Sequence, residues 1–130
     1  MILIVDDYLF LIGGLISIVW GIAHLVPTRT IVEMFGAISE ENKRVIAMSW
    51  IAEGISLIFI GVVVCLTVAI AGTENDGTRV VTWCAAGAMF SFVVVNLFTG
   101  FKSSIAPIKA CVFVDGVAGV LFLVGSIINS

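Results

Sequence analysis

The stretch VIAMSWIAEGISLIFIGVVVCLTVAIA, residues 45–71, decides the fold because it is apolar throughout and contains a single charged residue, Glu53. A helix needs about 20 mostly apolar residues to cross the hydrocarbon core of a bilayer. Three more stretches of this kind lie at 8–27, 80–101 and 105–128. They lack the alternation of barrel strands, and a backbone in lipid must satisfy its own hydrogen bonds. All four are therefore predicted to be transmembrane helices.

The composition of the whole chain agrees with this reading. Of 130 residues, 61% are apolar and 12% are charged, and the mean hydropathy is +1.25. A soluble domain is nearer half apolar and a quarter charged. We therefore expect an all-α integral membrane protein, a four-helix bundle in one domain (residues 1–130), surrounded by membrane lipid. The net charge of −3 leaves no basic face, so no nucleic-acid partner is expected.

The segments between the spans carry helix start and stop signals. The mixed segment 28–44 predicts a short interfacial helix ending near Gly36. Ser39, followed by two glutamates, is typical of an N-cap, so the second long helix is expected to begin before its apolar part. Pro107 falls where the first turn of the fourth long helix is expected, and its missing N–H does no harm there.

The cations predict the orientation. All but Arg79 lie in or beside the first and third loops, and the positive-inside rule assigns these loops to the cytoplasm. Both termini are then outside a multi-pass inner-membrane protein. The acidic start, residues 1–7, lacks the basic region of a secretory signal, so the mature chain is expected to begin at Met1. Asp6 and Asp7 are expected simply to end the first helix outside.

Each long helix contributes one polar side chain at a similar depth: His24, Glu53, Asn96 and Asp115. At 1.5 Å per residue they lie roughly 7 to 14 Å from the nearest cations of the cytoplasmic loops. A charge at mid-bilayer costs roughly 2.5 to 3.5 kcal/mol, so ionisable residues at this depth are expected to have a functional or structural role.

The four polar residues also lie on helix faces that are expected to pack against other helices. Small residues lie at helical spacing beside each of them, and small residues mark helix contacts in membranes. The second helix has the loosest stripe, which Leu57 interrupts. We expect all four polar groups to point into one interior. The stripes are Gly13, Ser17, Trp20, Gly21 and His24; Trp50, Glu53, Gly54, Leu57 and Gly61; Ala85, Ala88, Phe92, Asn96 and Thr99; and Cys111, Asp115, Ala118, Gly119, Phe122 and Ser126.

Two carboxylates in one low-dielectric site repel each other and favour sharing a proton. The predicted function is acid–base chemistry on a small lipophilic molecule, of the isomerase, cyclase or epoxide-opening type. Glu53 or Asp115 would be the acid, and the other carboxylate, helped by His24, the base. The residues expected to bind substrate are Asn96, Trp20, Trp50, Phe92 and Thr99.

Other uses of the same residues remain open. Intramembrane carboxylates also mark proton-coupled transport, and small transporters of this size work as dimers, so a homodimer is a possible assembly. A non-catalytic lipid- or quinone-binding subunit is a further alternative, as is simple bundle stabilisation by hydrogen bonds. His24, Glu53 and Asp115 could ligate a metal. With one histidine and no metal-binding motif, however, we predict no metal or cofactor, and the three cysteines are interpreted as buried apolar residues.

The sequence Gly21-Ile-Ala-His-Leu-Val-Pro27, followed by Phe35-Gly36 and Trp50-Ile-Ala-Glu-Gly54, resembles small four-helix membrane proteins of the DoxX-like group. The resemblance covers the first half of the chain and implies the four-helix topology. Members of the group often have a lysine where His24 stands, so no site residues carry over. The group includes redox-associated subunits, and it implies no single activity.

Overall fold

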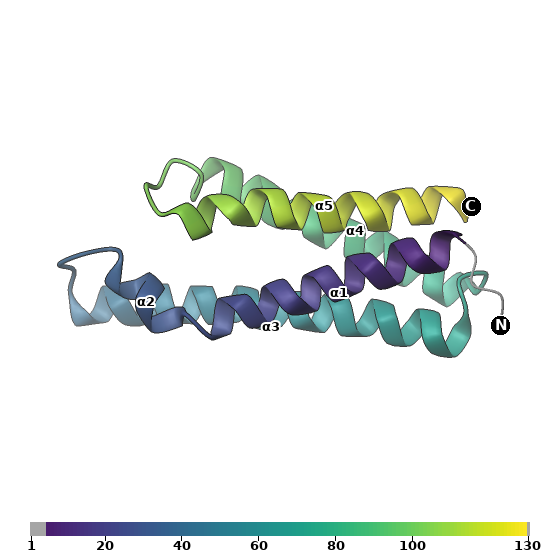
Figure 1. Cartoon of the computed structure of the whole chain (residues 1–130), viewed down its shortest axis with the longest axis horizontal. Helices are drawn as coiled ribbons and strands as arrows, with labels where there is room; N and C mark the ends of the chain where they lie inside the picture. Colours follow the sequence, from purple (N-terminus) through teal and green to yellow (C-terminus); the bar gives the residue numbers. More distant parts are fainter. Residues whose placement is uncertain (1–4, 130) are drawn as a thin grey trace.

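The computed structural model describes residues 5–129, which form five helices and no strand (Figure 1). Four of them are long and apolar enough to cross a membrane. This confirms the predicted all-helical class, the four long helices and the short helix after the first of them. The helices are α1 (Val5–Leu25), α2 (Thr28–Glu33), α3 (Glu40–Ala71), α4 (Asp76–Phe98) and α5 (Ala106–Ile128).

The ends of the helices follow the capping signals of the sequence. The Ser39 hydroxyl accepts a hydrogen bond from the backbone N–H of Asn42 at 3.2 Å, so α3 begins before its apolar part, as predicted. Gly72, with φ of 76°, ends the helix in a backbone conformation that favours glycine. The carboxamide oxygen of Asn75 accepts a hydrogen bond from the backbone N–H of Gly77 and caps α4, which therefore begins before the predicted apolar stretch 80–101. Pro107 lies in the first turn of α5, as predicted.

The long helices form two closely packed pairs, α1 with α3 and α4 with α5, and α1 also packs along α5. By contrast, α3 and α4 touch over much less of their length. Both described ends of the chain lie at the same end of the bundle, whereas α2 and the α4–α5 loop lie at the other (Figure 1). The bundle thus has one end with the termini and one with the loops that carry most of the cations.

Glycines allow α1 and α3 to approach closely. A Cβ atom on Gly21 would lie 2.5 Å from the carbonyl oxygen of Gly54, and one on Gly54 would lie 2.8 Å from Cβ of His24. The same relationship recurs further along, where a Cβ on Gly61 would collide with the carbonyl oxygen of Gly14. Since no larger residue fits, these glycines set the position of His24 relative to α3.

An apolar layer fills the middle of the bundle. Its largest side chains, Phe10, Leu57, Met89 and Phe122, are at most 1% exposed. The outward faces are also apolar: for example, Phe59 is 67% exposed and Ile70 is 82% exposed. A chain with an apolar core and an apolar exterior is typical of a protein surrounded by lipid.

Three expectations need correction. The cysteines are not all buried, because Cys111 is buried but Cys65 is half-buried and Cys84 is exposed. Asp6 and Asp7 lie in the first turn of α1, as expected, but they are buried inside the bundle instead of simply ending the helix outside. The buried face of α4 is also rotated from the predicted stripe: Met89 and Asn96 are buried, but Ala88 is only half-buried and Thr99 is exposed. Packing against α5 sets this rotation, which the pattern of small residues on one helix does not determine.

Candidate functional site

The structure brings together polar groups from all four long helices. Asn96, on α4, donates from Nδ2 to Oε1 of Glu53 on α3 at 2.9 Å and to Oδ2 of Asp115 on α5 at 3.4 Å. Asp115 and His24 are fully buried, Asn96 is nearly so, and Glu53 is half-buried. One carboxamide therefore holds two carboxylates from different helices in the interior of the bundle.

His24 is fixed in position by two tryptophans. Its Nδ1 lies 2.9 Å from the carbonyl oxygen of Trp20, and because a carbonyl only accepts, Nδ1 carries the hydrogen. Trp50 stacks on the imidazole with ring centroids 4.2 Å apart, and Trp20 meets it edge-on at 5.4 Å. The indole N–H of Trp50 also donates to the His24 carbonyl oxygen at 2.6 Å. The ring can therefore use only Nε2 for further contacts.

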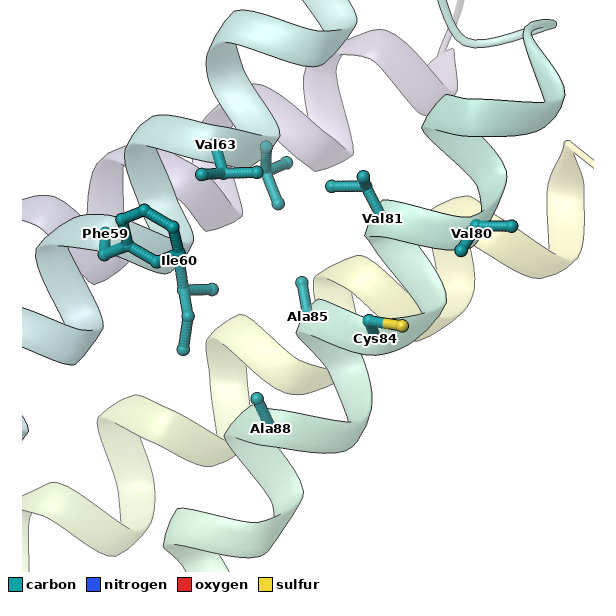
Figure 2. Close-up of a pocket in the computed structure, with 9 residues that line it drawn as sticks. Phe59, Ile60, Val63, Val80, Val81, Cys84, Ala85 and Ala88 are labelled. Atoms are coloured by element: carbon teal, nitrogen blue, oxygen red, sulfur yellow. The ribbon is translucent and has the colours of Figure 1, made fainter.

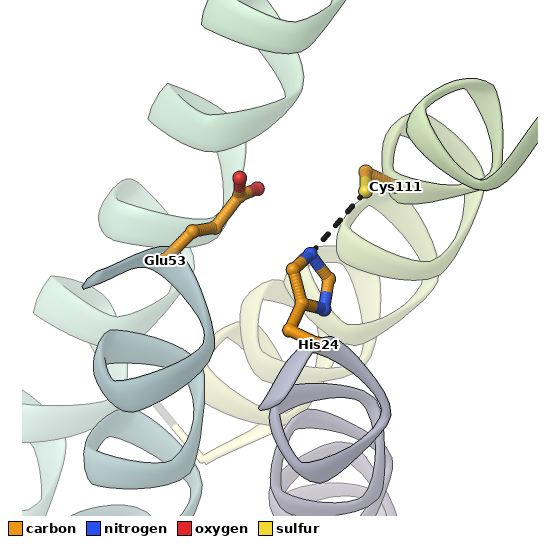
Figure 3. Close-up of side chains that lie close together, drawn as sticks. All are labelled: His24, Glu53 and Cys111. Atoms are coloured by element: carbon orange, nitrogen blue, oxygen red, sulfur yellow. Dashed lines mark hydrogen bonds between the residues drawn. The ribbon is translucent and has the colours of Figure 1, made fainter. Parts of the chain in front are cut away.

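This Nε2 atom faces a cysteine that sequence reasoning did not assign to the site. Cys111 Sγ lies 3.5 Å from His24 Nε2, and ligand atoms of His24, Glu53 and Cys111 all lie within 4.8 Å of one another (Figure 3). Among the described residues, no hydrogen bond joins His24 to a carboxylate. The sequence could have indicated that Cys111 belongs to the site, because Cys111 lies one turn before Asp115 on the buried face of α5.

The carboxyl groups of this cluster have no cationic partner among residues 5–129. Their ion pairs all lie on the surface, and Lys109 is exposed, with its Nζ 5.9 Å from the centre of the Phe101 ring. The Oδ1 atom of Asp115 is buried and accepts no hydrogen bond from the described residues. A buried carboxylate oxygen without a partner is costly, so the cluster has capacity for a proton or a further ligand.

Of the other predicted site residues, some contact the polar cluster and others lie outside it. Trp20 and Trp50 flank the imidazole, as described above. Phe92, one turn before Asn96, is half-buried and packs on the apolar layer. Thr99 is exposed, and its hydroxyl donates to the carbonyl oxygen of Val95 in its own helix at 2.6 Å, so the structure does not bring it into the cluster.

An apolar groove of about 280 Å³ opens where α3 and α4 separate. Figure 2 shows Ile60 and Val63 of α3 facing Val81, Ala85 and Ala88 of α4 across it. Glu53 and Asn96 lie about two turns beyond Ile60 and Ala88 on the same two helices. A second, more polar groove of about 700 Å³ lies between α2 and the start of α3; Leu25 lines it, next in sequence to His24.

Comparisons with protein-family models, curated proteins and solved structures found no match to this chain. The site is therefore interpreted from its own geometry.

Proposed function

We propose that this chain is a four-span inner-membrane protein that binds a small lipophilic molecule and performs acid–base chemistry on it. The observation that supports this most is the Asn96 carboxamide, which donates to both Glu53 and Asp115. Two carboxylates held together away from water are costly and are rarely needed for folding, whereas catalytic sites often contain such pairs.

The chemistry follows from the shared environment of the two carboxylates. Repulsion between them favours a state with one proton on the pair, which makes one group an acid and the other a base. Asn96 orients both groups, and His24, held between two tryptophan rings, is a further proton acceptor through Nε2. Proton donation to an alkene, epoxide or carbonyl would begin an isomerisation, cyclisation or ring opening.

The α3–α4 groove is the proposed route by which a lipophilic molecule enters from the bilayer. It is apolar and open, and it lies on the same two helices as Glu53 and Asn96. On the side away from α2, the packed layer of Leu57, Met89 and Phe122 adjoins the cluster. This layer favours a site reached from one side over a proton-coupled transport path through the bundle.

We further propose that both termini lie outside the cytoplasm. The cation-bearing loops share one end of the bundle, and the described ends of the chain share the other. Membership of the DoxX-like group also remains a proposal, and it rests on the Gly21–Pro27 and Trp50–Gly54 motifs. The resemblance implies the four-helix topology and no single activity.

Filling the groove tests the proposed route. Ala88→Trp places an indole in the groove, whereas Gly87→Trp places the same side chain at a position where an added Cβ atom would meet nothing within 4 Å. Both variants would be purified in nanodiscs, and the co-purifying small lipophiles identified by mass spectrometry. We expect one species to be present with the wild type and Gly87→Trp and lost with Ala88→Trp. If folded Ala88→Trp retains that species at the level of Gly87→Trp, the route is wrong.

A further inference from the structure

We infer that His24, Glu53 and Cys111 form a binding site for one transition-metal ion of the zinc type, with Asn96 and Asp115 as outer partners. The spacing of the ligand atoms carries the inference. An ion about 2.3 Å from a thiolate sulfur and about 2.05 Å from an imidazole nitrogen, at the tetrahedral angle, holds these atoms about 3.6 Å apart. Cys111 Sγ and His24 Nε2 lie 3.5 Å apart, with a Glu53 oxygen within 4.8 Å of both.

The second observation is the orientation of His24. A metal-binding histidine almost always donates its other ring N–H to a carbonyl or carboxylate, which fixes the tautomer and the ring plane. His24 does this through Nδ1 to the Trp20 carbonyl oxygen, and the stacked Trp50 ring prevents rotation. With the hydrogen of the neutral ring on Nδ1, Nε2 carries the lone pair, and this atom faces the Cys111 sulfur.

The third observation concerns the two carboxylates. Asn96 donates one hydrogen bond to Oε1 of Glu53, and the carboxylate has further lone pairs on its two oxygens for an ion. The same carboxamide holds Asp115, whose fully buried Oδ1 has no partner among the described residues. With no Lys or Arg side chain paired to the cluster in residues 5–129, a divalent ion would supply the compensating charge.

Imidazole, thiolate and carboxylate suit zinc, and three protein ligands with an open position are typical of catalytic sites. On binding, the Sγ–H bond of Cys111 breaks, an Sγ–metal bond forms and the proton passes to solvent. His24 keeps its Nδ1 hydrogen. The inference rests on the proposed function and deepens it. With an ion bound, Nε2 of His24 and the Glu53 carboxylate are ligands, so Asp115 and a water on the ion would take the acid–base roles.

Co²⁺ tests the site because its thiolate complexes absorb light in the near ultraviolet. The full chain carrying Cys65→Ser and Cys84→Ser retains Cys111 as its one thiol. The protein is reconstituted in nanodiscs and treated with a chelator to remove any bound metal. We then expect it to bind one Co²⁺ ion per chain and to show the absorption band of a Co²⁺–thiolate complex. Added Zn²⁺ should displace the Co²⁺ and abolish the band. A folded Cys65→Ser/Cys84→Ser protein that gives no such band overturns the inference.

Variants of the ligands locate the ion. Cys111→Ser in the otherwise wild-type chain should abolish the band, although Cys65 and Cys84 remain, and persistence of the band would overturn the inference. Asn96→Ala, which removes only an outer partner, should weaken Co²⁺ binding about 10- to 100-fold. If Cys111→Ser does not fold, Co²⁺ binding by Asn96→Ala and by the Cys65→Ser/Cys84→Ser protein still tests the inference. Co²⁺ binding needs no lipophile, so its failure is distinguishable from failure of the groove experiment.

Discussion

His24 and Cys111 meet across the interface between α1 and α5, with Nε2 and Sγ 3.5 Å apart although 87 positions separate the two residues in the sequence. The contact depends on the packing of α1 along α5 and on the glycines that draw α1 against α3. The polar cluster therefore forms only when the long helices pack together. Its contribution to stability and its chemistry can be tested separately.

Replacing Asn96 should destabilise the bundle. Asn96→Ala removes the donor shared by Glu53 and Asp115, so one half-buried and one fully buried acceptor lose their partner. We expect the free energy of unfolding to fall by about 1–3 kcal/mol, measured by reversible unfolding in mixed micelles. The matched control is Thr99→Ala, whose exposed hydroxyl bonds only to its own helix, with an expected change within about 0.5 kcal/mol. Equal effects of the two variants would contradict the proposed role of the carboxamide.

Glycine substitutions should have opposite signs at two positions. Gly21→Ala places a methyl group 2.5 Å from the Gly54 carbonyl oxygen and should lower the free energy of unfolding by about 1–3 kcal/mol, because the two backbones must separate. Gly87→Ala meets no atom within 4 Å and should raise the same quantity by about 0.5–1 kcal/mol, because alanine has the higher helix propensity. If Gly21→Ala is neutral or stabilising, the close approach of α1 to α3 is wrong.

Surface labelling tests the orientation. In the Cys65→Ser/Cys84→Ser chain, the remaining Cys111 is buried, so an introduced cysteine can be followed on its own. A membrane-impermeant maleimide added to intact cells should label Glu74→Cys, in the exposed α3–α4 turn, but should label Ser104→Cys only after permeabilisation. The reverse pattern would place both termini in the cytoplasm.

The sequence predicts much of the fold because its signals are local. Long apolar runs, the Ser39 cap and Pro107 each act within one helix, and each is found as expected. The buried face of α5 is likewise the stripe that contains Cys111 and Asp115. Periodicity within a single helix was sufficient for these features.

What the sequence does not determine depends on contacts between helices. The pairing of His24 with Cys111 needs the relative rotation and shift of α1 and α5. The exposure of Thr99 follows from the way α4 rotates against α5. The burial of Asp6 was missed because charged residues in a first helical turn are usually exposed to solvent. The pattern of residues along one helix predicts which face is buried, but it does not predict which residues of the other helices contact that face.

The central claim is that Glu53 and Asp115 act on a bound lipophile, and the most direct test compares the molecules that co-purify with Glu53→Gln, Asp115→Asn and the surface control Glu41→Gln. Each variant keeps the size of the side chain and should fold as a helical bundle, as circular dichroism can verify. We expect Glu41→Gln to carry the same species as the wild type, whereas both site variants should accumulate an unconverted precursor that mass spectrometry distinguishes. If both site variants fold and carry the wild-type species unchanged, the carboxylates are not the chemical centre; if neither folds, they serve to hold the bundle together.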